Sequence, residues 1–300
     1  MKKRFVNYKS LVIYHNKFNM VPLLDFTPLE HNLLFSIFRD MKYDGDNIFY
    51  WSLDEIKKMV SSKNLTNEEL VRLVESLKTK FFNCHFTIIL PRSDEFIHIF
   101  SYMKFVYDND DKTKIKGLEI KIADYALDVF KNLKKGFTSF SINIFKELRS
   151  SYSKNLFRFL SQYSSTGKYK VDYNEIRNLL DVPKYYDYRY FNFKILQPAI
   201  KELSNTFKDL KIEVIKDREN GKLVYKFLIF TFKPFKNSSS TQLEVLQPSK
   251  RNYTTLFALK IASQELNKIA NEKASKNKDY SNEQQAIRTL DTARFKKYNN

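Results

Sequence analysis

Cysteine, glycine and long apolar runs are scarce in this chain of 300 residues. Its single cysteine, Cys84, cannot close an intramolecular disulfide or build a multi-thiolate zinc site. The apolar neighbours of Cys84 predict a buried thiol, in a protein that works in a reducing cytoplasm. With five glycines and no GxxxxGK(S/T) motif, a phosphate-cradling loop of the P-loop type is not expected. No run of 18 apolar residues occurs, so no membrane span is expected.

Histidine is also rare, and its spacing does not indicate a metal site. The four histidines, which lack an HExxH pattern, are predicted to be ordinary core or surface residues: His15, His31, His85 and His98. The His-hydrophobic-His triplet of rolling-circle nickases is missing as well. Four clustered tyrosines are therefore interpreted as packing and phosphate-contacting residues: Tyr185, Tyr186, Tyr188 and Tyr190. We expect no catalytic residue, no metal and no cofactor.

Basic and aromatic residues are abundant. The 52 Lys and Arg outnumber the 34 Asp and Glu and give a net charge of +18, which attracts polyanions. Nucleic acid is the first partner to consider and an anionic membrane surface the second, although solubility alone can also explain a basic chain. A hydrophobic content of 43% with 27 Phe and 19 Tyr is ample for packed cores.

One short motif occurs twice. Ser52–Lys57 and Asp172–Arg177 each place a capping residue three positions before a glutamate, a pattern that opens helices. Each copy follows a short β-rich run and lies between a longer apolar helix and a second helix. Helix, short strand, helix, helix and hairpin is the element order of a winged helix. Two such units on a basic chain indicate binding to duplex DNA.

Periodicity and turn residues extend this pattern along the chain. In the first half we predict helices from Thr27-Pro28, over Leu53–Val60 and from Thr66, then three strands: Phe86–Leu90, Phe96–Tyr107 and Ile115–Ile122. A linking helix is expected over Tyr125–Leu133. In the second half we predict three helices: Tyr152–Tyr163, Tyr173–Leu180 and Tyr188–Ser204. A hairpin across Asn220-Gly221 follows, with strands over Leu210–Ile215 and Leu223–Phe232.

The predicted fold class is α+β, with two tandem winged-helix domains and a mostly disordered or helical tail. The first winged helix is predicted over residues 1–123 and the linking helix over 124–136. The second winged helix follows over 137–236 and the tail over 237–300. Within the tail, only Leu256–Ile269 has a helical pattern.

The helix before each hairpin is the one that a winged helix lays in the major groove. For the helix from Tyr188, projection at 100° per residue gathers an apolar side: Phe193, Leu196, Ile200 and Leu203. The opposite side and the adjoining hairpin supply the residues predicted to bind DNA: Arg189, Tyr190, Lys194, Gln197, Lys201, Lys216, Arg218 and Lys222. Pro198 removes one helical hydrogen bond and predicts a kink.

The corresponding helix of the first unit carries mixed charges on its outer side: Glu68, Arg72, Glu75 and Thr79. Carboxylates repel the phosphate backbone. Arg72 is therefore predicted to make a weaker DNA contact, on a helix that also suits a protein partner.

Several segments of the second half resemble the iteron-binding plasmid replication initiators, in the order in which that family carries them. They are Phe137–Phe140, Leu148–Phe157, Glu175–Arg177, Phe193-Lys194 and Leu196–Leu203. His15-Asn16 and the helix from Thr27 resemble the family's opening, so the resemblance covers about residues 10 to 233.

The resemblance implies two winged-helix domains that bind tandem direct repeats (iterons) at a plasmid origin. It also implies recruitment of a host replicative helicase or initiator protein, with no catalysis by the chain itself. Family members act as monomers on the repeats and as autorepressing dimers, whose contact the first domain supplies. Two alternatives stay open: a transcriptional repressor of the same fold and, from another class, an origin-nicking enzyme.

Overall fold

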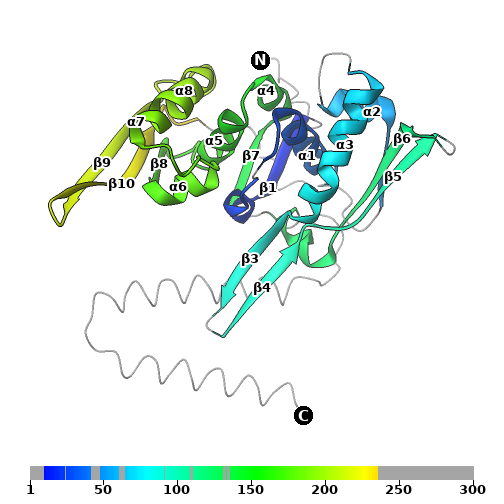
Figure 1. The fold of residues 1–300 in the computed structure, drawn as a ribbon, viewed down its shortest axis with the longest axis horizontal. Coiled ribbons are helices and arrows are strands. Elements are labelled where there is room, and N and C mark those ends of the chain that lie inside the picture. The colour runs from blue at the N-terminus through cyan, green and yellow to red at the C-terminus, as the bar shows by residue number, and fades with distance from the viewer. Residues whose placement is uncertain are drawn as a thin grey trace, which may run out of the picture. The chain divides into compact units, whose positions relative to one another are not determined.

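The computed structural model describes residues 10–23, 25–41, 48–60, 65–90, 92–108, 111–130, 133 and 136–235. These residues form helices and strands in the predicted order of two winged helices, so the α+β prediction is confirmed (Figure 1). No helix in this part of the chain is long and apolar enough to cross a bilayer. The predictions for residues 237–300, including the helix over Leu256–Ile269, lie outside the described residues.

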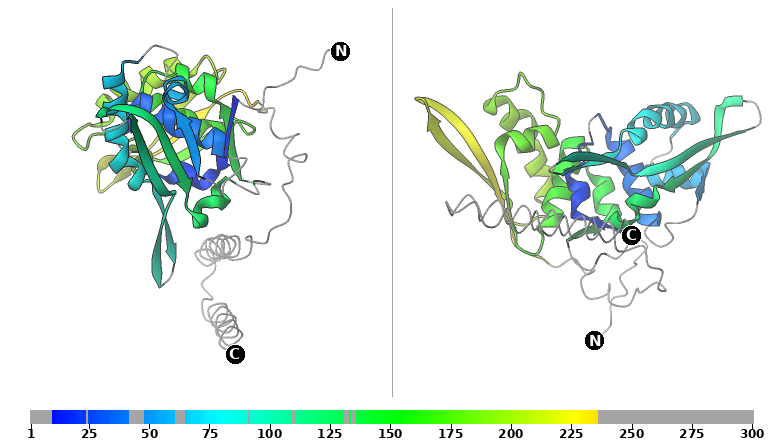
Figure 2. Two further views of the ribbon diagram at one scale, coloured as in Figure 1. Left: turned by 90° about the vertical axis from the view of Figure 1, so that its right-hand side faces the viewer. Right: turned by 90° about the horizontal axis from the view of Figure 1, so that it is seen from below.

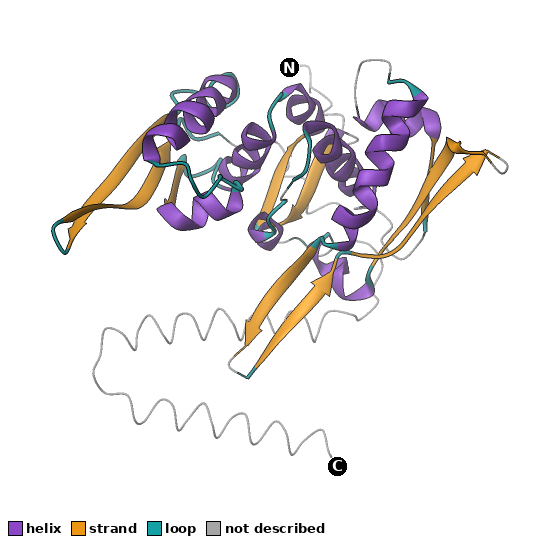
Figure 3. Cartoon of the chain, viewed as in Figure 1, coloured by secondary structure: helices purple, strands orange, loops and turns teal. Residues whose placement is uncertain are grey.

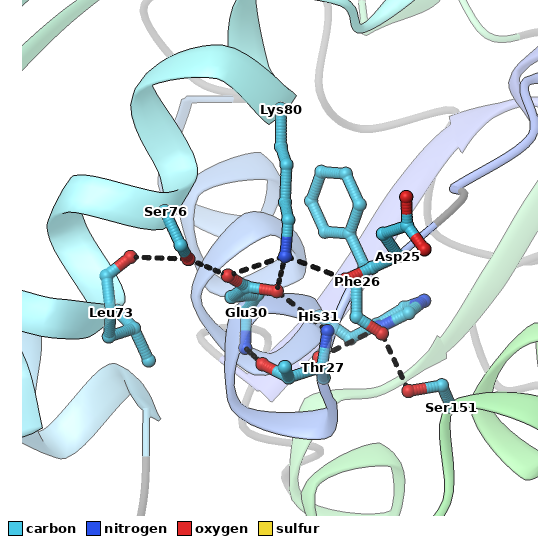
Figure 4. A network of polar contacts seen from close by, with 9 residues as sticks. All are labelled: Asp25, Phe26, Thr27, Glu30, His31, Leu73, Ser76, Lys80 and Ser151. Carbon is cyan, nitrogen blue, oxygen red and sulfur yellow. Dashed lines mark hydrogen bonds and ion pairs between the residues drawn. The ribbon is translucent and has the colours of Figure 1, made fainter.

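Helix α1 (Pro28–Met41) begins where its capping residues predict. The Thr27 N–H donates to the Glu30 carboxylate at 2.6 Å, and the Glu30 N–H donates to Thr27 Oγ1 at 3.3 Å. Figure 4 shows that the same carboxylate accepts from Ser76 and, at 2.7 Å, from Lys80 of helix α3 (Asn67–Phe82). Burial raises the pKa of Glu30, but these hydrogen bonds outweigh it and hold that pKa below its usual range. The cap of α1 therefore also fastens α1 to α3.

The first winged helix combines α1, α2 (Leu53–Val60) and α3 with an antiparallel sheet. Its strands lie in the order β2 (Phe49–Ser52), β6 (Asp111–Ile122) and β5 (Phe100–Asp108). The predicted capping boxes of α2 and α3 are both present.

The prediction of one strand over Phe96–Tyr107 is wrong, because the chain changes partner at Ile99. Strand β4 (Ser93–His98) pairs with β3 (His85–Leu90), whereas β5 pairs with β6. Ile99 is fully buried; its N–H donates to the Cys84 carbonyl and its own carbonyl accepts the Ala123 N–H. The two backbone hydrogen bonds of Ile99 point to different partners, and this change of partner ends β4 and starts β5.

A small sheet joins the start of the first winged helix to the start of the second. Strand β1 (Leu11–His15), which leads into the short helix η2 (Asn16–Met20), pairs antiparallel with β7 (Phe137–Ser141). The linking helix predicted over Tyr125–Leu133 is instead a 3₁₀ helix, η3 (Asp124–Val129). Ala123 at its start offers no side-chain cap, so the longer predicted helix lacks the bond that opens α1 and α3.

The second winged helix follows the same scheme. It contains α4 (Ile142–Glu147), α5 (Ser151–Gln162) and α6 (Tyr173–Leu179), and its sheet has the order β8 (Lys168–Asp172), β10 (Lys222–Thr231) and β9 (Lys211–Glu219). The Asp172 carboxylate caps α6 by accepting the N–H groups of Asn174 and Glu175. Figures 2 and 3 show the β9–β10 hairpin, the wing, extending beyond the helices of this domain.

Helix α5 carries two fully buried cations that sequence reasoning does not predict. The Arg158 guanidinium donates to the carbonyls of Phe18 at 3.2 Å and Val21 at 2.8 Å. Lys154 Nζ donates to Asn32 Oδ1 at 2.7 Å. Burial lowers the pKa of Lys154 to about 7 and that of Arg158 to about 10. These bonds tie α5 to η2 and α1, so both winged helices share one core.

Candidate nucleic-acid interface

The helix predicted over Tyr188–Ser204 is built from three segments. They are α7 (Tyr188–Phe191), a π-helical turn η4 (Asn192–Leu196) and α8 (Gln197–Leu203). The Asp187 carboxylate caps the helix by accepting the Tyr190 N–H at 2.8 Å. In the π turn the Gln197 N–H bonds the Asn192 carbonyl, five residues back instead of four. Pro198, which has no N–H to donate, follows directly, so the irregularity lies where proline predicts one.

The π turn changes which side chains face the core. Five residues of the helix are buried: Phe191, Ile195, Leu196, Ala199 and Leu203. The prediction that Phe193 belongs to the apolar side is wrong, because its side chain is 67% exposed. In the π turn, the residue one turn before Leu196 is five positions back, at Phe191. In a regular α-helix it would be three or four positions back, so Phe193 would turn toward the core instead.

The outer side of this helix carries the predicted polar set, all exposed: Arg189, Tyr190, Lys194, Gln197 and Lys201. None of its three cations forms an ion pair with a carboxylate of the described residues. The helix's carboxylate, Glu202, is instead occupied by the Arg149 N–H at 2.5 Å. The outer side therefore presents uncompensated positive charge to solvent.

Gln197 is held in a fixed orientation on this outer side. Its Nε2 donates to Asn192 Oδ1 at 3.2 Å across the π turn. An amide nitrogen has two N–H donors, so the second one and the amide oxygen remain available. A donor and an acceptor side by side match the N7 and N6 edge of adenine in the major groove.

The wing turns at Asn220-Gly221 as predicted. Both residues have positive φ, 50° and 75°, as a type I′ turn requires. In the register, Lys216 lies opposite Tyr225 and Arg218 opposite Leu223, so these four side chains share one face of the hairpin. Lys222 lies opposite Glu219 and shares the other face with it. The structure thus brings Lys216 and Arg218 together and separates Lys222 from them.

Stacked tyrosines fix the wing against the helix. The Tyr225 ring lies 4.5 Å from that of Tyr188 at the start of α7 and 5.2 Å from that of Tyr173 on α6. Lys216 Nζ lies 5.6 Å from the centre of the Tyr225 ring. Burial raises the pKa of Tyr188, as expected for a phenol half-covered by this cluster. The face with Lys216 and Arg218 is therefore the one that continues into the helix.

Arg72 lies apart from this surface, exposed on α3 of the first winged helix. Its neighbours Glu68 and Glu75 are also exposed, and Glu75 pairs with Lys78 at 2.7 Å. The mixed charge predicted for this helix is confirmed.

The remaining candidates for chemistry have structural roles. His31 is fully buried and bonds the Thr27 carbonyl, and Cys84 is buried as predicted, which raises the pKa of its thiol to about 12. His85 and His98 lie opposite each other on the β3–β4 hairpin, and each points Nδ1 at a backbone carbonyl. Among the described residues, no three His, Cys, Asp or Glu side chains gather in a way that could hold a metal ion.

Comparison with known proteins agrees with this architecture. A model described as "Initiator Replication protein, WH1" matches residues 11–161, and one described as "Initiator Rep protein, WH2" matches residues 172–232. The chain is 26% identical over 226 residues to a "Probable replication protein rep" of Bifidobacterium longum (strain NCC 2705), covering 74% of this chain and 72% of that protein. The crystal structure of the Pi initiator protein in complex with iteron DNA shares the fold, with a TM-score of 0.53 and 15% identity, over 77% of this chain and all of that one. The chain belongs to the initiator replication protein family and is a plasmid replication initiator with two winged-helix domains.

Proposed function

We propose that this initiator binds tandem direct repeats in duplex DNA at its plasmid origin, with the second winged helix as the main reader. One observation carries the proposal. The outer side of α7–α8 is basic, unpaired with carboxylates of the described residues, and joined by stacked tyrosines to the basic face of the wing. The Pi initiator, which has this fold, was crystallised with iteron DNA.

Each part of the surface has a role that its chemistry supports. Gln197, oriented by Asn192, would read an adenine edge, and Lys194 and Lys201 would reach guanine acceptors or phosphates. Lys216 and Arg218 would hold phosphates beside the groove, which sets register without carrying sequence information. No bond is broken in this scheme, as expected for an initiator that is not an enzyme.

We further propose a division of labour between the predicted segments. The first domain, residues 1–123, supplies a homodimer contact and, through Arg72, an auxiliary DNA contact, and residues 124–136 link it to the reader, residues 137–236. The mixed charge of α3 supports this division, because a helix with exposed Glu68 and Glu75 suits a protein partner better than a phosphate backbone. A host replicative helicase or initiator is the expected further partner.

Fluorescence anisotropy tests the proposal. The duplex comes from immediately upstream of the protein's own gene, a scrambled duplex serves as the control, and both are titrated over a salt series. We expect tight binding to the first duplex only, with a steep loss of affinity as salt rises. Equal and weak binding to both duplexes would contradict a sequence-reading role.

Two further assays separate the alternatives. A footprint over several direct repeats supports initiation, whereas a single protected inverted repeat would favour a transcriptional repressor. Supercoiled plasmid incubated with the protein and magnesium should stay uncut. Accumulation of nicked circles would favour an origin nickase and contradict the assignment of a non-catalytic initiator.

A further inference from the structure

Phe193 is a large apolar side chain placed on the surface that we propose meets DNA. Its ring is 67% exposed, although burying a phenylalanine in a core is worth about 1.5–3 kcal/mol. Single exposed apolar residues are common on proteins, so exposure alone indicates nothing. The position of Phe193 is what makes it informative, because Tyr190, Lys194 and Gln197 surround it on the outer side of the helix.

The backbone holds Phe193 in this position. The π turn that spans Asn192–Leu196 gives the core position to Phe191 and turns Phe193 outward. The hydrogen bond that Gln197 Nε2 donates to Asn192 Oδ1, at 3.2 Å, closes the same turn from the outside. Lys194 Nζ lies 5.3 Å from the centre of the Phe193 ring, so the cation and the aromatic face support each other.

The major groove offers one kind of apolar group to such a ring. Phosphates, sugars and the polar base edges present oxygen and nitrogen, whereas thymine presents its C5-methyl group. We propose that Phe193 is a specificity-determining residue that contacts the methyl group of a thymine in the repeat, and this inference rests on the proposed function. Because Gln197 lies one turn further along the same side and matches adenine, the two side chains together favour neighbouring A·T pairs.

Deoxyuridine tests the contact, because it differs from thymidine only by that methyl group. Each thymine of the protected repeat is replaced in turn, and dissociation constants are measured by anisotropy for the wild type and for Phe193→Ala. Phe82→Ala is the matched control, since Phe82 is 73% exposed but lies at the end of α3 in the first winged helix.

At one position the wild type should lose about fourfold in affinity, the effect of one methyl group leaving an apolar contact. Phe193→Ala should bind the unmodified repeat more weakly and show no further loss at that position, while Phe82→Ala keeps the wild-type response. Selective binding that is indifferent to every deoxyuridine, or a deoxyuridine effect that survives in Phe193→Ala, would overturn the inference alone. The absence of selective binding by the wild type would overturn the proposed function with it.

Discussion

His31 should make the first winged helix sensitive to mild acid. Its ring is fully buried on α1 between Phe26 and Phe35, with Nδ1 3.0 Å from the Thr27 carbonyl. A carbonyl only accepts, so Nδ1 donates to it, and Nε2 lies 3.4 Å from the Asn155 side-chain amide. Burial, aided by the nearby charges of Arg158 and Lys154, lowers the pKa of His31 from 6.5 to about 3.

The sign and size of the effect follow from this pKa. Between about pH 6.5 and pH 3 the unfolded chain binds a proton that the folded chain does not, so the free energy of unfolding falls as the pH falls. Between pH 7 and pH 5, above the range in which most carboxylates titrate, the loss from this one histidine is about 2 kcal/mol.

Urea unfolding at pH 7 and pH 5 measures this loss. Trp51, the single tryptophan, is a suitable fluorescence probe because it is buried and donates its indole N–H to Asp40 at 3.0 Å. His31→Phe, which keeps a ring but removes the titration, should lose about 2 kcal/mol less than the wild type between the two pH values. His98→Gln, a change at an exposed histidine, should behave like the wild type. If the wild type and His31→Phe lose the same stability, His31 is not held neutral in the folded protein.

Three further predictions concern the second winged helix. Gly167→Ala should destabilise the chain by at least about 2 kcal/mol in urea unfolding, because φ is +67° and the new Cβ would lie 2.4 Å from the Phe232 carbonyl oxygen; an unchanged midpoint would refute this. Arg218→Ala should lower the dependence of log affinity on log salt by about 0.9, while Lys222→Ala, on the other face beside Glu219, should change it less; equal changes would show that both faces touch DNA. Lys154→Met should remove the rise in stability that the wild type gains from about pH 7 toward pH 10, since burial lowers the pKa of Lys154 to about 7; a rise that persists would assign it to another group.

Local chemistry made much of the fold predictable. A cap residue followed three positions later by a carboxylate opens a helix, and the Thr27–Glu30 and Thr66–Glu69 pairs both form the bonds that this spacing predicts. The type I′ turn likewise depends only on Asn220-Gly221.

Features that depend on distant partners were not predictable. The break at Ile99 arises because β4 and β5 pair with different strands. The Arg158 guanidinium of α5 bonds the carbonyls of Phe18 and Val21, which precede it by 140 and 137 residues, and Lys154 bonds the Asn32 side chain 122 residues earlier. The exposure of Phe193 depends on a π turn, which a projection at 100° per residue cannot represent. Lys216, Arg218 and Lys222 look alike in the sequence because all three are basic, and only the strand register separates Lys222 from the other two.

The most direct test of the account compares two variants on the specific and the scrambled duplex. Lys194→Ala/Lys201→Ala removes two unpaired cations from the outer side of α7–α8, and Arg72→Ala removes one from α3 of the first winged helix. If the second winged helix reads the repeats, the double variant should lose about 1–3 kcal/mol of specific binding per base contact, with a smaller loss on the scrambled duplex. Arg72→Ala should lose less on both duplexes. Unchanged binding by the double variant, or a larger loss in Arg72→Ala, would contradict the assignment of α7–α8 as the reading helix.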